Sequence, residues 1–80
     1  MQRGIKNIKL ATFRKFLKHK GLKKIRTSGG HEVWSHPDLT RPVILQSHID
    51  PIPQFVIASN LRTMKSSKKE FIAFLNKYKY

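Results

Sequence analysis

Cysteine is absent from this chain of 80 residues, and acidic residues are scarce. Without cysteine the protein can form neither a disulfide framework nor a thiolate zinc site, which suits a reducing compartment. The 4 Asp and Glu residues are dispersed, which argues against a nuclease that holds two metal ions with carboxylates. The sequence also contains no P-loop and no GxSxG nucleophile motif.

Long apolar segments are missing as well. No run of apolar residues approaches the roughly 20 residues that span a bilayer. The basic N-terminus is not followed by the apolar core of a signal peptide. We therefore expect a cytoplasmic protein that has no membrane partner.

Positive charge is what the chain has in excess. It carries 17 Lys and Arg residues against 4 Asp and Glu, a net charge of +13. No acidic residue precedes Glu32, and the densest basic segment is Arg14–Arg26. Such a field attracts phosphate groups and speeds association with anionic partners. RNA, DNA or an acidic protein is the expected partner, whereas Lys77 and Lys79 are interpreted as solubilising residues.

The hydrophobic periodicity predicts one small α+β domain over residues 1–80. Residues 1–9 are interpreted as a loosely ordered, basic N-terminus. A helix is expected over Thr12–Lys20, with Thr12 as its N-cap and Gly21 just beyond its end. Short turns join three predicted strands, which favours an antiparallel meander. These strands are Leu22–Thr27, Glu32–His36 and Arg41–Ser47.

Two further helices are predicted after the strands. Pro53 suits the first turn of a helix, and the apolar stripe of this helix comprises Ile57, Leu61 and Met64, widened by Phe55, Val56 and Ala58. Ser67-x-x-Glu70 is a capping-box pattern that opens a C-terminal helix over residues 67–78. Its apolar stripe comprises Phe71, Phe74, Leu75 and Tyr78. The predicted order is therefore α-β-β-β-α with an additional C-terminal helix.

His31 is the candidate catalytic residue, because it follows Gly29 and Gly30 in a turn between two predicted strands. Glycines let a ligand approach the backbone closely, and imidazole exchanges protons near neutral pH. A turn histidine in an ordinary setting most often makes a local hydrogen bond, but the basic surroundings here favour a functional role. The preceding strand supplies candidate phosphate ligands: Lys23, Lys24 and Arg26.

The other histidines have weaker claims to function. His36 is interpreted as a turn-capping or surface residue, and His19 as an exposed residue of the first helix. His48 either approaches the glycine turn or ends the third strand, and we expect the latter. A zinc site of His31, His48 and Asp50 is an alternative, but these residues lack the spacing of a compact zinc motif.

Trp34 is either part of the core or an exposed platform on which bases stack. Strand alternation places Val33 on the same face as His31, and Trp34 on the opposite face. We expect Trp34 in the core, because a domain this small depends on burying its large aromatic side chains.

A nuclease of this composition would act on RNA. RNA carries its own nucleophile, the 2′-hydroxyl group, so cleavage needs a base and stabilisation of the charged phosphorane. One histidine among basic side chains can supply both. We therefore expect neither a metal ion nor another cofactor.

Several short segments occur in an order that is typical of one protein family. They are the helix end FLKHKGL (16–22), the strand KKIR (23–26), the turn SGGH (28–31), HPD (36–38), RPVI (41–44) and the helix over 57–64. Together, across residues 13–74, they resemble the HicA toxins, also called YcfA-like mRNA interferases. The final helix extends beyond the shortest members of that family.

This resemblance implies a fold like that of double-stranded-RNA-binding domains. It also implies a toxin of a type II toxin-antitoxin system that cleaves mRNA in bacteria and is neutralised by an acidic HicB-type antitoxin. The catalytic histidine of the family corresponds to His31. Gly30 stands where the family usually has serine or threonine, and Glu32 where it often has a second histidine.

The leading hypothesis is therefore a metal-independent endoribonuclease. His31 would take the proton of a 2′-hydroxyl group, and the attack would leave a 2′,3′-cyclic phosphate. The RNA backbone would be held by Lys23, Lys24, Arg26, Gly29 and Gly30. The first alternative is a non-catalytic RNA-binding module of the same fold, and the second is a structural protein of the ribosome.

Overall fold

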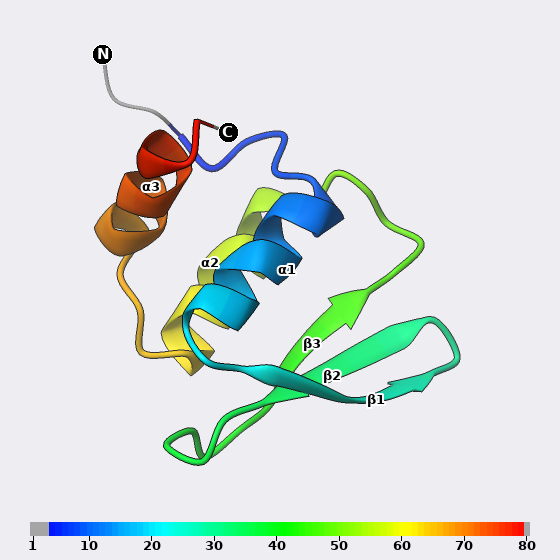
Figure 1. The fold of residues 1–80 in the computed structure, drawn as a ribbon. Coiled ribbons are helices and arrows are strands. Elements are labelled where there is room, and N and C mark those ends of the chain that lie inside the picture. The colour runs from blue at the N-terminus through cyan, green and yellow to red at the C-terminus, as the bar shows by residue number, and fades with distance from the viewer. Residues whose placement is uncertain (1–3, 80) are drawn as a thin grey trace.

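The structure, a computed structural model, describes residues 4–79 and has three helices and three strands in the predicted order. The elements are α1 (Leu10–His19), β1 (Lys23–Ser28), β2 (His31–Ser35), β3 (Val43–Gln46), α2 (Gln54–Thr63) and α3 (Lys68–Lys77) (Figure 1). This confirms the α+β class. None of the helices in the described part of the chain is long and apolar enough to cross a membrane.

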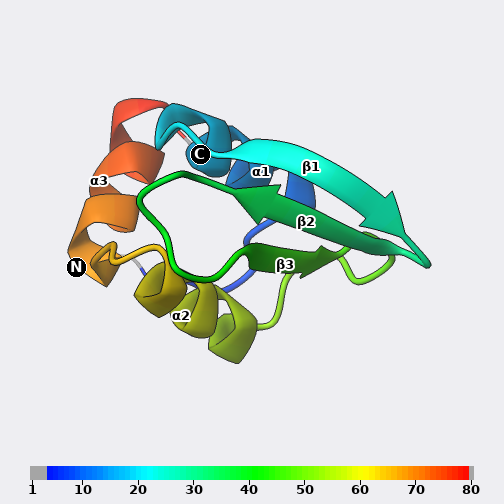
Figure 2. The same cartoon turned by 90° about the horizontal axis from the view of Figure 1, so that it is seen from below.

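The three strands form one antiparallel sheet in the order β1-β2-β3, which confirms the predicted meander. The helices lie on one side of this sheet, and Figure 2 views the molecule from the side of the strands. Gly29 and Gly30 form the two-residue turn between β1 and β2, with φ angles of 55° and 80°. Two successive positive φ angles define the type I′ turn, whose twist matches that of a hairpin.

The hydrophobic core lies between the sheet and the helices. Trp34 is only 2% exposed and packs in this core, as predicted. The aromatic rings of Phe13 and Phe16 on α1 contact Phe71 on α3 at centroid distances of 5.5 and 4.8 Å. Fully burying one such large apolar side chain stabilises a fold by about 1.5–3 kcal/mol.

Helix α1 starts earlier than predicted and is capped from a distance. It begins at Leu10, whose N–H donates to Oδ1 of Asp50 at 3.1 Å, so Thr12 is not the N-cap. A carboxylate 40 residues away thus satisfies one of the free N–H groups of the first turn. The other end matches the prediction, because Gly21 has a φ of 85° and the N–H of Leu22 donates to the Leu17 carbonyl.

The N-terminal segment was predicted to be loosely ordered. Ile5 and Ile8 of this segment are buried, and Ile8 forms a β-bridge with Ile52; residues 1–3 lie outside the described part. One expectation about an apolar residue was wrong. Phe55 was assigned to the apolar stripe of its helix but is 76% exposed. It lies two residues from Ile57, about 200° around a helix, and therefore points away from the core.

The predicted N-cap of α3 is confirmed. The hydroxyl group of Ser67 accepts a hydrogen bond from the backbone N–H of Glu70 at 2.9 Å. The Glu70 carboxylate does not complete a capping box, because it bonds the Ser66 hydroxyl group and pairs with Lys20 at the end of α1. The Lys20–Glu70 ion pair therefore connects the first and last helices.

Glu32 is the one buried carboxylate of the described residues, and it is 3% exposed. Its Oε1 accepts hydrogen bonds of 3.1 Å from Nε of Arg14 and from Nε1 of Trp34, and Arg14 Nη2 bonds the second oxygen. The hydrogen bond from Arg14 holds the pKa of Glu32 below its ordinary value. This group joins α1 to the central strand.

We expect Glu32→Gln to destabilise the protein by about 1–3 kcal/mol at pH 7, because it breaks a charged hydrogen bond. Since the folded state lowers the pKa of Glu32, its stabilising effect is complete above the unfolded pKa of about 4.3 and is lost as the pH falls through the folded value. Urea unfolding at pH 7, 5 and 3 should therefore show a smaller acid-induced loss of stability in the variant.

Glu70→Gln is the matched control for this experiment. It removes an exposed ion pair, which contributes at most about 1 kcal/mol. Equal destabilisation by the two substitutions, or an unchanged acid response in Glu32→Gln, would contradict the role assigned to Glu32.

Candidate nucleic-acid interface

The register of the sheet decides which side chains share a face with His31. Cross-strand partners point to the same side of a sheet, and neighbours along a strand point to opposite sides. Glu32 and Trp34 face the helices, where they contact α1 and the core. His31 and Val33 therefore point to the opposite side, which we call the open face.

Three polar side chains form a row across the open face. His31 pairs with Ser28 on β1 and with Gln46 on β3. The N–H of Ser47 donates to the Gly30 carbonyl at 2.8 Å, which makes His31 and Gln46 a non-hydrogen-bonded pair, the type in which side chains lie closer. His31 is exposed, so its imidazole is accessible from solvent.

A β-bulge in β1 separates two of the predicted phosphate ligands. Lys24 pairs with Trp34 and Arg26 pairs with Val33, so two steps along β1 match one step along β2. Arg26 consequently lies on the open face with His31, whereas Lys24 points toward the side of the helices. Lys23 pairs with Ser35, which returns it to the open face.

His48 approaches the glycine turn, contrary to our expectation that it only ends the third strand. A Cβ atom added at Gly30 would lie 3.1 Å from Nδ1 of His48, so the ring lies directly against this glycine. The backbone after β3 bends back because Ile49 N–H donates to the Gln46 carbonyl at 3.2 Å. The sequence places His48 near a strand end but does not show which way the following turn folds.

The remaining histidines have other contacts. Nδ1 of His36 accepts a hydrogen bond from the N–H of Asp38 at 3.0 Å, which confirms the predicted turn cap. His19 is exposed, as predicted, and its ring packs 5.1 Å from that of Phe74. Across residues 4–79, no three His, Asp or Glu side chains are grouped as metal ligands. Asp50, a residue of the alternative zinc set, instead caps α1.

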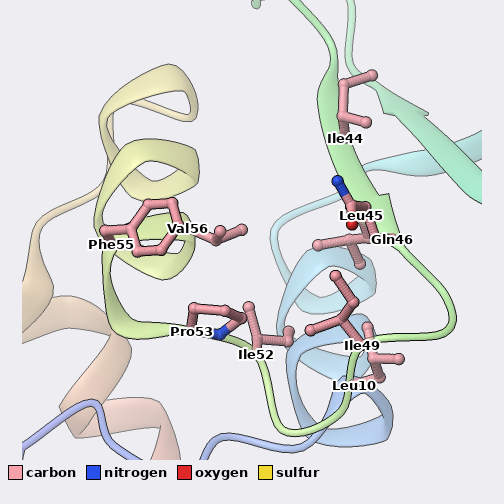
Figure 3. Close-up of a pocket in the computed structure, with 9 residues that line it drawn as sticks. All are labelled: Leu10, Ile44, Leu45, Gln46, Ile49, Ile52, Pro53, Phe55 and Val56. Carbon is pink, nitrogen blue, oxygen red and sulfur yellow. The ribbon is translucent and has the colours of Figure 1, made fainter.

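An apolar groove of about 280 Å³ lies between α2 and β3 (Figure 3). Phe55 and Val56 line it from the helix, and Ile44 and Gln46 from the strand. None of its nine lining residues is charged, so the groove offers no ionic contact to a phosphate group. Gln46 belongs to both the groove and the row beside His31.

Each of the four acidic side chains has a partner elsewhere than on the open face, although only Glu32 is buried. Glu32 pairs with an arginine and Glu70 with a lysine. Asp50 accepts a backbone hydrogen bond, and Asp38 lies 3.8 Å from an imidazole nitrogen. Arg26 and Lys23 on the open face therefore have no carboxylate neighbour among these four.

Sequence reasoning missed Ser28 and Gln46 as neighbours of His31. Ser28 was assigned to the turn, but a two-residue Gly-Gly turn would have placed it opposite His31. Gln46 lay within a predicted strand, and its pairing depends on the length of the loop between the second and third strands. That loop runs from residue 36 to 42, and its length gives no unique register.

No protein family, curated protein or solved structure matches the chain.

Proposed function

We propose that the protein is a metal-independent endoribonuclease that acts on mRNA in the cytoplasm, as a toxin of the HicA type. The observation that carries the proposal is the composition of the open face. An accessible His31 lies between Ser28 and Gln46, with Arg26 in the next row, on a chain of net charge +13. The helices on one side of an antiparallel sheet are compatible with a fold like that of double-stranded-RNA-binding domains.

The proposed reaction uses the nucleophile that RNA already contains. Neutral His31 takes the proton of a 2′-hydroxyl group, and O2′ attacks the adjacent phosphorus atom. Arg26 and Lys23 stabilise the negative charge that develops on the phosphorane oxygens. Gly29 has no side chain, and the space that a Cβ atom would fill there is open, so the RNA backbone can approach the end of the hairpin.

Replacing His31 with alanine should reduce the rate of RNA cleavage by about 10²–10⁴-fold, because the general base is lost. Cleavage of a labelled mRNA is measured in EDTA by mapping new 5′ ends, with thermal unfolding as the check on folding. His19→Ala, which removes an exposed imidazole that packs against Phe74 of α3, is the control and should cleave normally.

The same experiment separates the enzyme from its main alternative, a non-catalytic RNA-binding module. Such a module would bind the RNA and produce no new ends with either protein. Cleavage by a folded His31→Ala protein at the original rate would show that another group is the base.

Arg26 and Lys24 form a matched pair of basic residues on opposite faces of one strand. We expect Arg26→Ala to weaken binding of single-stranded RNA and to lower the slope of log K against log salt by about 0.7, the value of one phosphate contact. Lys24→Ala should change the slope less, although it removes the same charge. Equal changes would mean that the general field, rather than the open face, binds the RNA.

We further propose an acidic HicB-type antitoxin as the natural partner. Its negative charge would complement the +13 charge of this chain and make association fast, up to about 10⁸–10⁹ M⁻¹s⁻¹ at low salt. The apolar groove beside exposed Phe55 supports a protein partner, because it suits apolar side chains rather than phosphates.

We expect such a partner to protect the β1–β2 hairpin and the basic face of α1 from amide hydrogen exchange. The measurement compares free His31→Ala protein with its complex with an acidic HicB-type antitoxin. Amides of α3 serve as the internal reference. Full inhibition of the active protein without protection over residues 12–31 would contradict direct coverage of His31.

A further inference from the structure

His48 lies at the same end of the sheet as His31 and is held there by the turn that follows β3. Its Nδ1 and Cε1 lie 3.1 and 3.6 Å from the position that a Cβ atom of Gly30 would occupy. The preceding residue, Ser47, donates two hydrogen bonds to the Gly30 carbonyl, from its N–H at 2.8 Å and from its hydroxyl group at 2.9 Å. The segment that carries His48 is thereby fixed to the residue that precedes His31.

Gly30 makes this placement possible in two ways. Its φ of 80° is one that side-chain-bearing residues rarely adopt. Its missing side chain also leaves the space in which the His48 ring lies. Gly29 has a similar φ of 55°, but a Cβ atom there would meet nothing within 4 Å. The ring contact is therefore a specific property of position 30.

Cleavage of RNA through the 2′-hydroxyl group requires two proton transfers. One proton must leave the attacking O2′, and another must reach the departing O5′, because an alkoxide is a poor leaving group. The histidine that accepts the first proton lies on the side of the attacking O2′. The departing O5′ lies on the opposite side of the phosphorus, so a second group is better placed to donate a proton to it. Lysine is a weak candidate because its ordinary pKa is about 10.4.

We propose that His48 is this general acid; the inference rests on the proposed ribonuclease function. His31 accepts the proton of the 2′-hydroxyl group while the O2′–P bond forms. The P–O5′ bond breaks as the His48 imidazolium donates its proton to O5′. The products are a 2′,3′-cyclic phosphate and a 5′-hydroxyl end, and the two histidines exchange protonation states. His48 is exposed, so its ring is accessible to the RNA backbone.

The test compares two RNA substrates under single-turnover conditions in EDTA. One is an ordinary oligonucleotide, and the other has sulfur in place of the bridging O5′ at the cleavage site. A thiolate leaves without protonation, so this substrate does not need a general acid. We expect His48→Ala to slow cleavage of ordinary RNA by about 10²–10⁴-fold and to cleave the sulfur substrate at nearly the parent rate. His31→Ala should stay slow on both.

Each other outcome has a distinct meaning. If the parent protein cleaves neither RNA, the proposed ribonuclease function fails and the role of His48 fails with it. If the parent cleaves both and His48→Ala matches it on ordinary RNA, only the inference about His48 is overturned. If His48→Ala is equally slow on both substrates, the residue acts structurally and is not the acid.

Gly30→Ala and Gly29→Ala provide a matched second test. Both place a side chain at a positive φ, so both share the backbone strain, but only Gly30→Ala meets the His48 ring. Misplacing a catalytic group by about 1 Å can cost 10²-fold in rate. We expect Gly30→Ala to cleave ordinary RNA up to about 10²-fold more slowly than Gly29→Ala, with a smaller gap on the sulfur substrate. Equal rates for the two variants on ordinary RNA would contradict a role for the placement of His48.

Discussion

The two-residue turn at Gly29–Gly30 is the constraint on which the arrangement of the sheet depends. Its two positive φ angles close the β1–β2 hairpin with Ser28 opposite His31. A slip of one residue would move every side chain of a strand to the other face. His31 would then point toward the helices, and Glu32 would lose Arg14. The part-buried Arg14–Glu32 ion pair and the accessible histidine are therefore consequences of one register.

The Arg14–Glu32 pair connects this register to the helices. Burying a carboxylate is costly unless strong hydrogen bonds compensate for the lost hydration. Glu32 receives three hydrogen bonds, two from Arg14 and one from Trp34. Because α1 supplies the arginine and β2 the other two residues, this contact fixes α1 against the central strand. It also supplies hydrogen bonds to the buried carboxylate of Glu32 on the helix-facing side of the sheet, away from the open face.

The sequence was sufficient to predict the order and type of the helices and strands in residues 4–79, because hydrophobic periodicity marks the helices and turn or capping residues separate the elements. It also placed Trp34 in the core and Ser67 at the start of the last helix. These features depend on local spacing and on turn chemistry. They require no knowledge of which segments meet in space.

Apart from the exposure of Phe55 and the pairing of Ser28, which follow from local helix and turn geometry, the features that were missed depend on contacts between distant segments. The start of α1 is set by Asp50, which lies 40 residues further along the chain. The bulge that sends Lys24 and Arg26 to opposite faces appears only when β1 pairs with β2. The position of His48 depends on a turn that bends back to Gly30. The charge and the hydrophobic periodicity of one segment carry no information about its contacts with distant segments.

The position of β1 gives its basic residues a structural explanation that competes with RNA binding. It is an edge strand in which every residue is exposed, and exposed edges invite pairing with other chains. Lysines and bulges are common means of preventing such pairing. This explanation accounts for Lys24 and for the bulge, but it does not require Arg26 to share a face with His31. The same bulge that protects the edge turns Arg26 toward the row of Ser28, His31 and Gln46, and that second effect is what edge protection leaves unexplained.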